Sequence, residues 1–579
     1  MFAKKTFIKK TALLLGAALL IFSSCAKKAR TELSDGTFRG RGAGRNGPIV
    51  VEVTVKDGKA TEARIVEEQE TEDIGFPAEA EIIEEFLNYE GNTDIDVVSG
   101  ATLTSNALIS ALQAALDASH GVVEAKEKFT DTETDIVVIG AGGAGLTAAT
   151  EAALNGAKVI VLEKAGIAGG NTNSSTGGLN ASETSVQKKL KIEDSNESFF
   201  EDTMKGGHYK NDPALVQTLV ENSAAIVDWL QSDDIGADLS DVGIMGGSTN
   251  KRTHRPAGGQ AIGSHLVPKL YDAAKGAGAE IRLNNAVIDI IEKNGRAVGV
   301  KVQNEAGSYE IRAKAVIIAT GGFGANPKMI EKYRSDLKDF PTTNVKTTTG
   351  DAFAWLEKFD AKLRLMEEIQ THPSVVPGKG ILITEAVRGN GAIMISHEGK
   401  RFVNELDTRD ATSAAVLALP EKRAYIFFNQ DVRKSLKAIE GYAKAGLLTS
   451  GKTVEEIAKK LNIEPAALLD SLRKYNEAQK SGIDRDFGRT YMARSLEEGP
   501  FYAVEIESAI HHTMGGVEIN ERAQVMNKKG YAVSGLYAAG EVTGGVHGDN
   551  RLGGNAVADI TIFGKIAADS ALKDIGLRP

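Results

Sequence analysis

Short apolar runs that end in glycine recur along this chain, and the most informative one begins at residue 136. Residues 136–139 are apolar and β-branched, a Gly-x-Gly-x-x-Gly sequence follows over residues 140–145, and an alanine-rich stretch comes next. This order predicts a buried strand, a tight turn and a helix. A second apolar run, residues 159–162, ends at Glu163. The pair predicts a dinucleotide-binding unit, in which the glycines admit a diphosphate to the helix N-terminus and the acid binds a ribose hydroxyl.

The pattern of a buried strand ending in glycine returns twice, over residues 315–322 and 535–541. Between the ribose acid and these strands lies a second glycine-rich loop, residues 169–180. The first fingerprint leaves the choice between FAD and NAD open. A second loop of this kind fits FAD better, because the flavin end of FAD extends past the nucleotide-binding unit.

A different pattern occupies the first part of the chain. Val50, Val53 and Val55 alternate with polar residues, and Lys-Asp-Gly-Lys follows over residues 56–59, which predicts a β-hairpin. The elements predicted after it are a strand over residues 63–66 and helices over residues 78–87 and 107–118. These elements predict a small α+β unit.

The first residues predict a targeting segment. Four lysines precede an apolar run, residues 12–22, that is too short to span a bilayer. Small residues then lead to Cys25, which resembles a bacterial lipoprotein signal, with Phe22 where leucine is usual. We expect residues 1–25 to be a lipoprotein signal peptide with an acylated cysteine, and residues 26–34 to be a tether. The alternative is an ordinary cleaved signal peptide, and both predict an exported protein.

The composition of the chain limits which cofactors and partners it can have. The chain has 579 residues, enough for several domains, and its 42% hydrophobic and 25% charged content is typical of globular proteins. A net charge of −10 argues against nucleic acid as a partner. The single cysteine excludes an intramolecular disulfide, cysteine-ligated iron–sulfur clusters and covalent haem attachment. We therefore expect electrons to travel on flavin or nicotinamide, with no metal site.

The α+β unit contains the motif Asp96-x-x-Ser99-Gly100-Ala101-Thr102 just before its last helix. It resembles the motif of FMN-binding domains that are substrates of flavin transferases, in which the phosphate of FMN is bonded to the threonine. The resemblance implies covalent FMN on Thr102, attached by a flavin transferase. Little side-chain bulk surrounds that hydroxyl, and a helix N-terminus favours a phosphate. The alternative is an N-cap and a turn before the helix.

Several polar and charged segments lie between residues 370 and 555. A lone buried arginine or histidine is often structural, but the set resembles the FAD-dependent fumarate reductases of the flavocytochrome c type, in the fumarate reductase and succinate dehydrogenase flavoprotein family. The segments are residues 370–373, 383–389, 401–405, 408–410, 511–516 and 547–555.

The resemblance implies a multidomain fold of α/β and α+β class. A Rossmann-like FAD-binding domain carries an inserted capping domain and is preceded by the small α+β FMN-binding domain. The expected bounds are 35–120 for the FMN-binding domain, 121–132 for a linker, 133–364 with 509–579 for the FAD-binding domain, and 365–508 for the capping domain.

Site residues are carried over from the resemblance position by position. His512, Arg551 and Arg409 would hold one carboxylate of a small dicarboxylate, and His372, Thr384 and the backbone of Glu385 the other. Bidentate pairing explains why arginine is wanted there. The residues expected to hold non-covalent FAD are Gly140, Gly142, Gly143, Ala144, Gly145, Glu163, Lys164, Gly170, Asn171, Thr172, Gly177, Gly178, Asp351, Glu541, Gly554 and Asn555.

The implied reaction is hydride transfer from N5 of reduced FAD to an α,β-unsaturated acid, with a proton from Arg409 that is resupplied through Glu385 and Arg388. Retention of His372 and Thr384 favours fumarate as the substrate. Urocanate or another enoate is the alternative, but the flanking Thr371 and Ala386 lack the aromatic or acidic character expected for urocanate. Two other possibilities are an exported flavin electron carrier without turnover, and an oxidase or dehydrogenase acting on succinate or aspartate.

The route of electrons departs from that of flavocytochrome c, because this chain has no haem motif. FMN on Thr102 takes the corresponding N-terminal place. We expect a membrane-associated electron donor and an exported, membrane-anchored lipoprotein in the periplasm or at the cell surface.

Overall fold

A computed structural model describes residues 33–44, 47–68, 75–89, 91–98, 102–121 and 128–578. The expected signal peptide with Cys25, most of the tether, residues 99–101 of the FMN motif and half of the expected linker (residues 122–127) lie outside the described residues.

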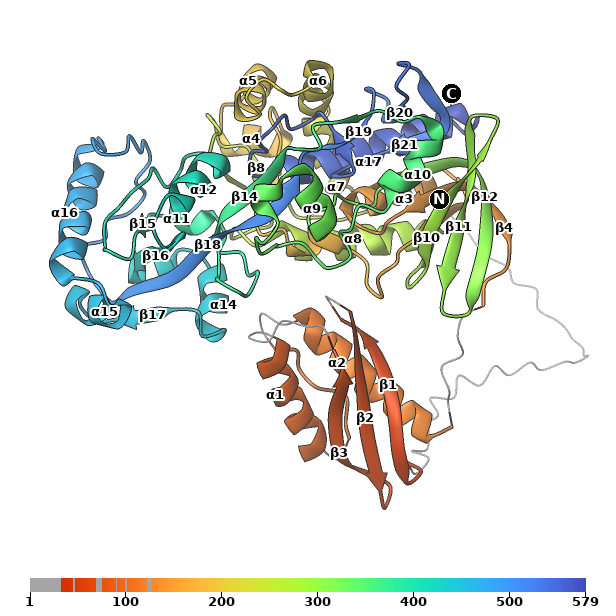
Figure 1. The fold of residues 1–579 in the computed structure, drawn as a ribbon, viewed down its shortest axis with the longest axis horizontal. Coiled ribbons are helices and arrows are strands. Elements are labelled where there is room, and N and C mark those ends of the chain that lie inside the picture. Colours follow the sequence, from red (N-terminus) through yellow and green to blue (C-terminus); the bar gives the residue numbers. More distant parts are fainter. Residues whose placement is uncertain are drawn as a thin grey trace, which may run out of the picture.

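The N-terminal domain is a three-stranded antiparallel sheet covered by two helices (Figure 1). Val51, Val53 and Val55, at alternate positions of the central strand, are buried against α2, whereas Val50 of the predicted set is half-buried on the opposite face. Gly40 and Gly42 let this helix approach β1, because a Cβ at either position would lie within 2 Å of a helix carbonyl oxygen. The elements are β1 (Gly36–Ala43), β2 (Pro48–Lys56), β3 (Lys59–Glu67), α1 (Gly75–Asn88) and α2 (Thr102–Ser119). The helix predicted from residue 107 therefore begins earlier, at Thr102.

The cofactor domain is built on a mixed sheet of eight strands. Its centre is parallel: β12 pairs with β4 on one side and β21 on the other, and β4 continues to β5 and β9. The predicted strands that end in glycine are therefore neighbours in this sheet. Its strands are β4 (Thr132–Ile139), β5 (Val159–Leu162), β9 (Glu280–Arg282), β10 (Ala286–Lys293), β11 (Arg296–Asn304), β12 (Gly307–Ile318), β20 (Gln524–Met526) and β21 (Ala532–Ala538).

Helices α3 (Gly143–Leu154), α8 (Ile262–Gly276) and α17 (Asn555–Asp574) pack beside this sheet and on one another. Nine of the twelve residues of α3 are apolar or glycine, which suits a helix enclosed by neighbours. The other helices are α4 (Ser185–Leu190), α5 (Asn196–Gly206), α6 (Pro213–Glu221), α7 (Ser223–Leu230), α9 (Pro327–Tyr333), α10 (Ala352–Leu356), and the 3₁₀ turns η1 (Gly170–Ser174), η2 (Ser335–Leu337) and η3 (Glu357–Phe359). Two small sheets join β6 (Leu179–Asn180), β7 (Asp241–Gly243) and β8 (Thr253–Arg255), and β13 (Leu363–Arg364), β19 (Gly516–Glu518) and β22 (Thr543–Gly544).

The capping domain has its own antiparallel sheet and hydrophobic core. Figure 1 shows its helices α15 and α16 at the end of the molecule opposite β10, β11 and β12. The strands are β14 (Ile369–Val375), β15 (Ile393–Ile395), β16 (Arg423–Asn429), β17 (Thr449–Gly451) and β18 (Phe501–Thr513). The helices are α11 (Ala386–Gly389), α12 (Arg409–Leu417), α13 (Gln430–Lys434), α14 (Ala438–Lys444), α15 (Val454–Leu461) and α16 (Pro465–Ser481).

Strand β18 connects the capping domain to the cofactor domain without interruption. It pairs with β14, β16 and β17 of the capping sheet, and its last residues lead directly into β19 beside the cofactor domain. The expected boundary between residues 508 and 509 falls inside this strand. The two domains therefore share this strand, because the hydrogen-bonded pairing of β18 with β14 continues on both sides of the expected boundary.

Among the described residues, no helix combines the length and apolar character needed to cross a membrane.

Candidate functional site

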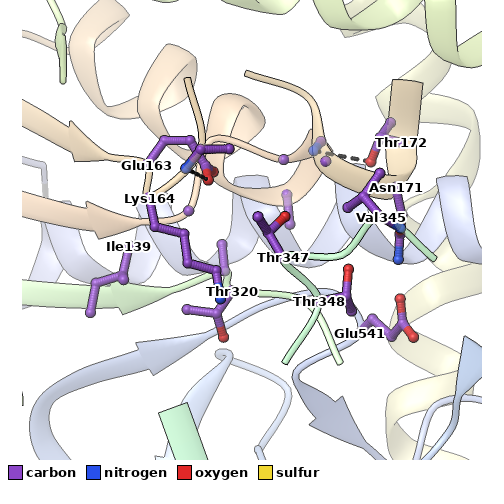
Figure 2. A pocket seen from close by; sticks show the side chains of 18 of the residues that line it. Ile139, Glu163, Lys164, Asn171, Thr172, Thr320, Val345, Thr347, Thr348 and Glu541 are labelled. Carbon is purple, nitrogen blue, oxygen red and sulfur yellow. Dashed lines mark hydrogen bonds between the residues drawn. The ribbon is translucent and has the colours of Figure 1, made fainter. Parts of the chain in front are cut away.

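A cradle lined by the glycine fingerprint opens at the carboxyl ends of β4, β5 and β12 (Figure 2). The N-terminus of α3 faces it, and the backbone nitrogen of Gly143 donates to Oγ1 of Thr172 at 3.1 Å. Figure 2 shows Glu163 and Lys164 at one end of the cradle and Asn171, Thr172 and Glu541 toward the other. Glu541 is far in sequence from the other four residues, so distant parts of the chain meet in this cradle.

Two positions in the fingerprint explain why glycine is needed. Gly140 has a φ of 102°, and a Cβ there would lie 2.4 Å from the carbonyl oxygen of Ala319. A Cβ on Gly145 would lie 1.9 Å from the carbonyl oxygen of Gly140, so this glycine allows the helix to pack against the turn. By contrast, a Cβ on Gly142 would meet nothing closer than 3.9 Å. The open side of Gly142 faces the cradle and suits close approach of a diphosphate.

Glu163 is held at the end of β5 by backbone donors. Its carboxylate accepts from the nitrogen of Ala141 at 2.9 Å and from the nitrogen of Ala165 at 2.8 Å. Burial raises the pKa of Glu163 above its usual value of 4.5, although these hydrogen bonds oppose the shift. Lys164 donates to Asp351 at 2.7 Å, which links the strand to the segment before α10. A buried carboxylate at this place fits a ribose, and the open glycine turn fits a diphosphate, so the residues fit the adenosine half of FAD.

Most of the expected FAD residues line a cavity. Those in the cradle are Gly140, Gly142, Gly143, Ala144, Glu163, Lys164, Gly170, Asn171, Thr172, Asp351 and Glu541, and a second cavity includes Gly177, Gly178 and Gly554. Gly145 and Asn555 line neither of these. The side chain of Asn555 instead bonds to Asn180 at 2.7 Å and to Thr203 at 3.1 Å, so its contacts support the loop before α17.

The second cavity, of about 1080 Å³, continues from the flavin end of the cradle into the capping domain. Both cavities include Asn171, Thr172 and Glu541, so the two spaces adjoin. The expected substrate residues in its wall are His372, Thr384, Glu385, Arg409, His512 and Arg551. The structure therefore brings together the whole set that the sequence predicts for substrate binding.

Glu385 is the centre of a charged cluster on the capping side. Nε of Arg409 donates to its Oε1, Nε2 of His372 lies 3.5 Å from the same oxygen, and Nη2 of Arg388 lies 3.7 Å away. Burial alone would raise the pKa of Glu385, but the charge of Arg409 and the contact with His372 outweigh it and hold the pKa well below 4.5. Glu385 is therefore a carboxylate at neutral pH.

The imidazole beside Glu385 is neutral. Burial lowers the pKa of His372 to about 3, although Glu385 opposes the shift. Arg388 is 2% exposed and lies behind Glu385, outside the cavity wall, where burial lowers its pKa from 12.5. Its Nη1 donates to the carbonyl oxygen of Glu405 at 2.8 Å. The order Arg409, Glu385, Arg388 is thus continuous from the cavity into the protein.

Arg551 and His512 face the cavity from the side of the cofactor domain. Burial, with the charge of Arg409, lowers the pKa of Arg551 to about 9, so it remains protonated at neutral pH. Burial lowers the pKa of His512 well below 6.5. Among the described residues, Nε of Arg551 and Nε2 of His512 have no hydrogen-bond partner. Buried donors without partners are costly, and an anionic ligand in the cavity would satisfy them.

Three residues of this cavity or its support were missed from the sequence. His511 lines the wall beside His372, with ring centroids 5.1 Å apart, and Gln370 bonds to both Arg409 and Arg551. Tyr442 on α14 lines the cavity and accepts from the backbone nitrogen of Thr384 at 3.0 Å. His511 and Gln370 adjoin predicted residues in the motifs, whereas Tyr442 is distant in sequence and no signal marks it.

A bulge explains why two consecutive histidines reach the cavity. Opposite β14, Gln370 pairs with His512 while Thr371 pairs with Ile510, so His511 is an extra residue in β18. Neighbouring residues of a regular strand point to opposite faces, and a bulge relaxes this rule. Both imidazoles therefore line one cavity.

The N-terminal domain contributes to the outer part of the same cavity through α1, residues 96–98 and Thr104. Thr102 is the first residue of α2, as its expected place before a helix requires, but its side chain lies outside the described residues.

Comparison with known proteins agrees with this architecture. Residues 135–557 match the FAD binding domain family, and residues 44–117 match the FMN-binding domain family. The chain is 47% identical over 441 residues to fumarate reductase (cytochrome) of Shewanella frigidimarina, covering 76% of this chain and 77% of that protein. It is 32% identical to urocanate reductase of Eggerthella lenta over 98% of this chain and 99% of that protein.

Among solved structures, the open conformation of a flavocytochrome c3 fumarate reductase superposes with a TM-score of 0.66 at 43% identity, covering 77% of this chain and 79% of that one. The expected fold class is confirmed by these matches. The chain is a flavin enoate reductase that belongs to the FAD-binding fumarate reductase family and carries an N-terminal FMN-binding domain.

Proposed function

We propose that this protein reduces fumarate to succinate. The observation that carries the proposal is the composition of the second cavity, where cationic and neutral donors from both domains face one space beside the flavin end of the cradle. A planar dicarboxylate has an anionic group at each end. Arg551, His512 and Arg409 would bind one carboxylate, and His372, Thr384 and the backbone of Glu385 the other.

Binding at both ends would orient and polarise the double bond between them. When bound, reduced FAD supplies a hydride from N5. The negative charge that then develops on the substrate is met by Arg551 and Arg409. Arg409 gives a proton to the other carbon, and Glu385 returns one to Arg409. Arg388, on the far side of Glu385, resupplies that carboxylate.

An arginine is an unusual acid because it holds its proton throughout the working pH range. Two features support the assignment here. The acceptor would be a strongly basic carbanion, and the ionised Glu385, which lies between Arg409 and Arg388, can relay a replacement proton from Arg388 to Arg409. His372 is a poorer donor because burial keeps it neutral.

Electrons would reach FAD from the N-terminal domain. Thr102 would hold FMN covalently after attachment by a flavin transferase, and this group would supply one redox centre between a membrane-associated donor and FAD. The position of Thr102 at the start of an 18-residue helix supports a phosphate there. We further propose that the protein is exported and anchored through an acylated Cys25.

Urocanate reduction is the second candidate. Tyr442 supports it, because this structure places an aromatic ring at the Thr384 end of the cavity, where the adjacent sequence offers none. The similarity to a urocanate reductase extends over both flavin domains. Fumarate remains favoured because His372 and Thr384 line that end together, with the imidazole of His511 beside His372.

Anaerobic reoxidation separates these candidates. The protein is reduced chemically, mixed with fumarate, urocanate, acrylate or crotonate, and followed by flavin absorbance. Fast reoxidation by fumarate is expected. Reoxidation by urocanate alone would replace the proposed substrate, and reoxidation by none of the four would favour an electron carrier. The reverse direction is tested by reduction of the oxidised protein with succinate or aspartate.

A further inference from the structure

Gln370 lies on β14 between the two arginines that the proposed function places on one substrate carboxylate. It is 3% exposed. Its Oε1 accepts a hydrogen bond from Nη1 of Arg409 at 3.2 Å and another from Nη2 of Arg551 at 3.3 Å. One neutral oxygen is therefore shared by two guanidinium groups.

The orientation of this amide is fixed by its nitrogen. Nε2 of Gln370 donates to Oδ1 of Asn550 at 2.6 Å and to the carbonyl oxygen of Arg551 at 2.8 Å. A reversed amide would lose both bonds and direct its N–H groups at two cations. The hydrogen-bond network thus leaves one arrangement, with the oxygen toward the arginines.

The two arginines come from different domains. Arg409 begins α12 in the capping domain, whereas Arg551 precedes α17 in the cofactor domain. Each repels the other, and the charge of Arg409 contributes to the lowered pKa of Arg551. Something must hold them near one another in the absence of a ligand. Gln370 contacts both arginines, and its main chain pairs with His512 across the bulge in β18.

An amide is suited to this task in a way that a carboxylate is not. A carboxylate at this position would bind both guanidinium groups more strongly, but its charge would cancel one of the two positive charges. A neutral acceptor orients the groups and adds no second negative charge to that of Glu385, which already pairs with Arg409.

We propose that Gln370 is a positioning residue that gathers Arg409 and Arg551 on one neutral oxygen, so that both present their charge to the same substrate carboxylate. The proposal rests on the proposed function of the site. In this arrangement, Arg409 and Arg551 together, rather than either arginine alone, select a substrate that ends in a carboxylate.

Two substitutions separate charge from position. Gln370→Glu is nearly isosteric and keeps an acceptor oxygen for both arginines while it adds a negative charge; it also gives up the two bonds that Nε2 donates to Asn550 and to the carbonyl oxygen of Arg551. Gln370→Met keeps the volume and the charge of the site but removes the hydrogen bonds. Gln303→Glu, an exposed position on β11, is the matched control for an added carboxylate. The measurements are kcat and KM for fumarate in anaerobic reoxidation, the Kd of succinate by calorimetry, and the melting temperature.

Gln370→Glu is expected to raise both KM and the Kd of succinate at least about tenfold, because hydrogen-bonded charge pairs of this kind contribute that much. Gln370→Met is expected to lower kcat at least about tenfold with a smaller change in the Kd of succinate, because Arg409 loses its fixed position. The control should match the wild-type protein in all three measurements.

The proposal is overturned if Gln370→Glu binds succinate within about twofold of wild type. It is also overturned if both variants change kcat and KM in the same proportion, which would indicate packing alone. If Gln370→Met lowers the melting temperature strongly, the Kd of succinate measured for Gln370→Glu still tests the proposal. Wild-type protein that fumarate does not reoxidise would refute the proposed function and this inference together, whereas active wild type with unchanged variants would refute this inference alone.

Discussion

The guanidinium of Arg409 and the carboxylate of Glu385 form an ion pair in the wall of the second cavity, with 13% and 12% of their side chains exposed. The pair joins the start of α12 to the residue before α11. Because the charge of Arg409 holds the pKa of Glu385 well below 4.5, the carboxylate stays ionised and able to accept a proton from Arg388. The pair therefore supports a proton route that leads away from the cavity.

Replacement of Arg409 by alanine tests the proton donor. Arg409→Ala is expected to lower the rate of fumarate reduction at least about 100-fold, since a positioned acid typically contributes that much. FAD should stay bound, because Arg409 lies outside the cradle. Stopped-flow reoxidation gives the rate and flavin absorbance gives the occupancy. Arg473→Ala, at an exposed position of α16, is the control, and near-normal turnover by Arg409→Ala would contradict the assignment.

Replacement of Glu385 by glutamine tests the next step. Gln retains an acceptor for Arg409 but cannot hold the proton that is passed on, so kcat is expected to fall about 100-fold or more. The Kd of succinate should change less. A solvent isotope effect on reoxidation should increase in the variant if proton return has become limiting. Equal losses in kcat and succinate affinity would instead indicate a disrupted site.

Stability should depend on pH in part through the three histidines that line the second cavity. Burial lowers the pKa of His372 to about 3 and those of His511 and His512 well below 6.5, whereas in the unfolded chain they titrate near 6.5. Below that pH the unfolded chain binds protons that the folded protein does not. The free energy of unfolding is thus expected to fall as the pH drops, by about 1 kcal/mol per histidine between pH 6.5 and 5.5.

Urea denaturation at pH 7.5, 6.5 and 5.5 measures this dependence. His372→Gln removes one of these groups and should reduce the loss of unfolding free energy between pH 6.5 and 5.5 by about 1 kcal/mol. A variant with the slope of the wild-type protein would show that His372 is not neutral in the fold.

Substitution of Gly145 tests the cradle. Gly145→Ala places a methyl group 1.9 Å from the carbonyl oxygen of Gly140, which should destabilise the protein by about 1–3 kcal/mol and abolish FAD binding. Gly276→Ala, where nothing lies within 4 Å of the added Cβ, is the control. Acid precipitation followed by fluorescence of the released flavin measures FAD. Full FAD content in Gly145→Ala would contradict the close approach of helix and turn.

Substitution of Thr102 tests the route of electrons. Thr102→Ala is expected to lack covalent FMN, measured as flavin that stays with the denatured protein and by mass spectrometry. Chemically reduced variant should still be reoxidised by fumarate at the wild-type rate, because the FAD site is intact. Thr61→Ala on β3 is the control. Covalent flavin that persists in Thr102→Ala would place the attachment elsewhere.

The cofactor-binding turn could be predicted from the sequence because it depends on residues that are close together along the chain. Strand, glycine turn and helix are encoded within residues 136–154, and Gly140 and Gly145 are each required by a contact or a dihedral angle at their own position. The substrate residues were found through the resemblance rather than through periodicity. His511 escaped because its orientation depends on a bulge set by the partner strand, and Tyr442 because α14 meets Thr384 only in the folded protein. Gln370 escaped because its role depends on arginines from two domains.

The continuity of β18 has a consequence for engineering. Excision of residues 365–508 would remove β14, β16 and β17 and leave only the last five residues of β18. Those five include His511, His512 and Thr513, whose positions depend on the ladder that would be lost. The capping domain therefore cannot be exchanged as residues 365–508 alone. A chimaera that alters substrate choice should instead transplant the complete strand, its bulge and its partners as one unit.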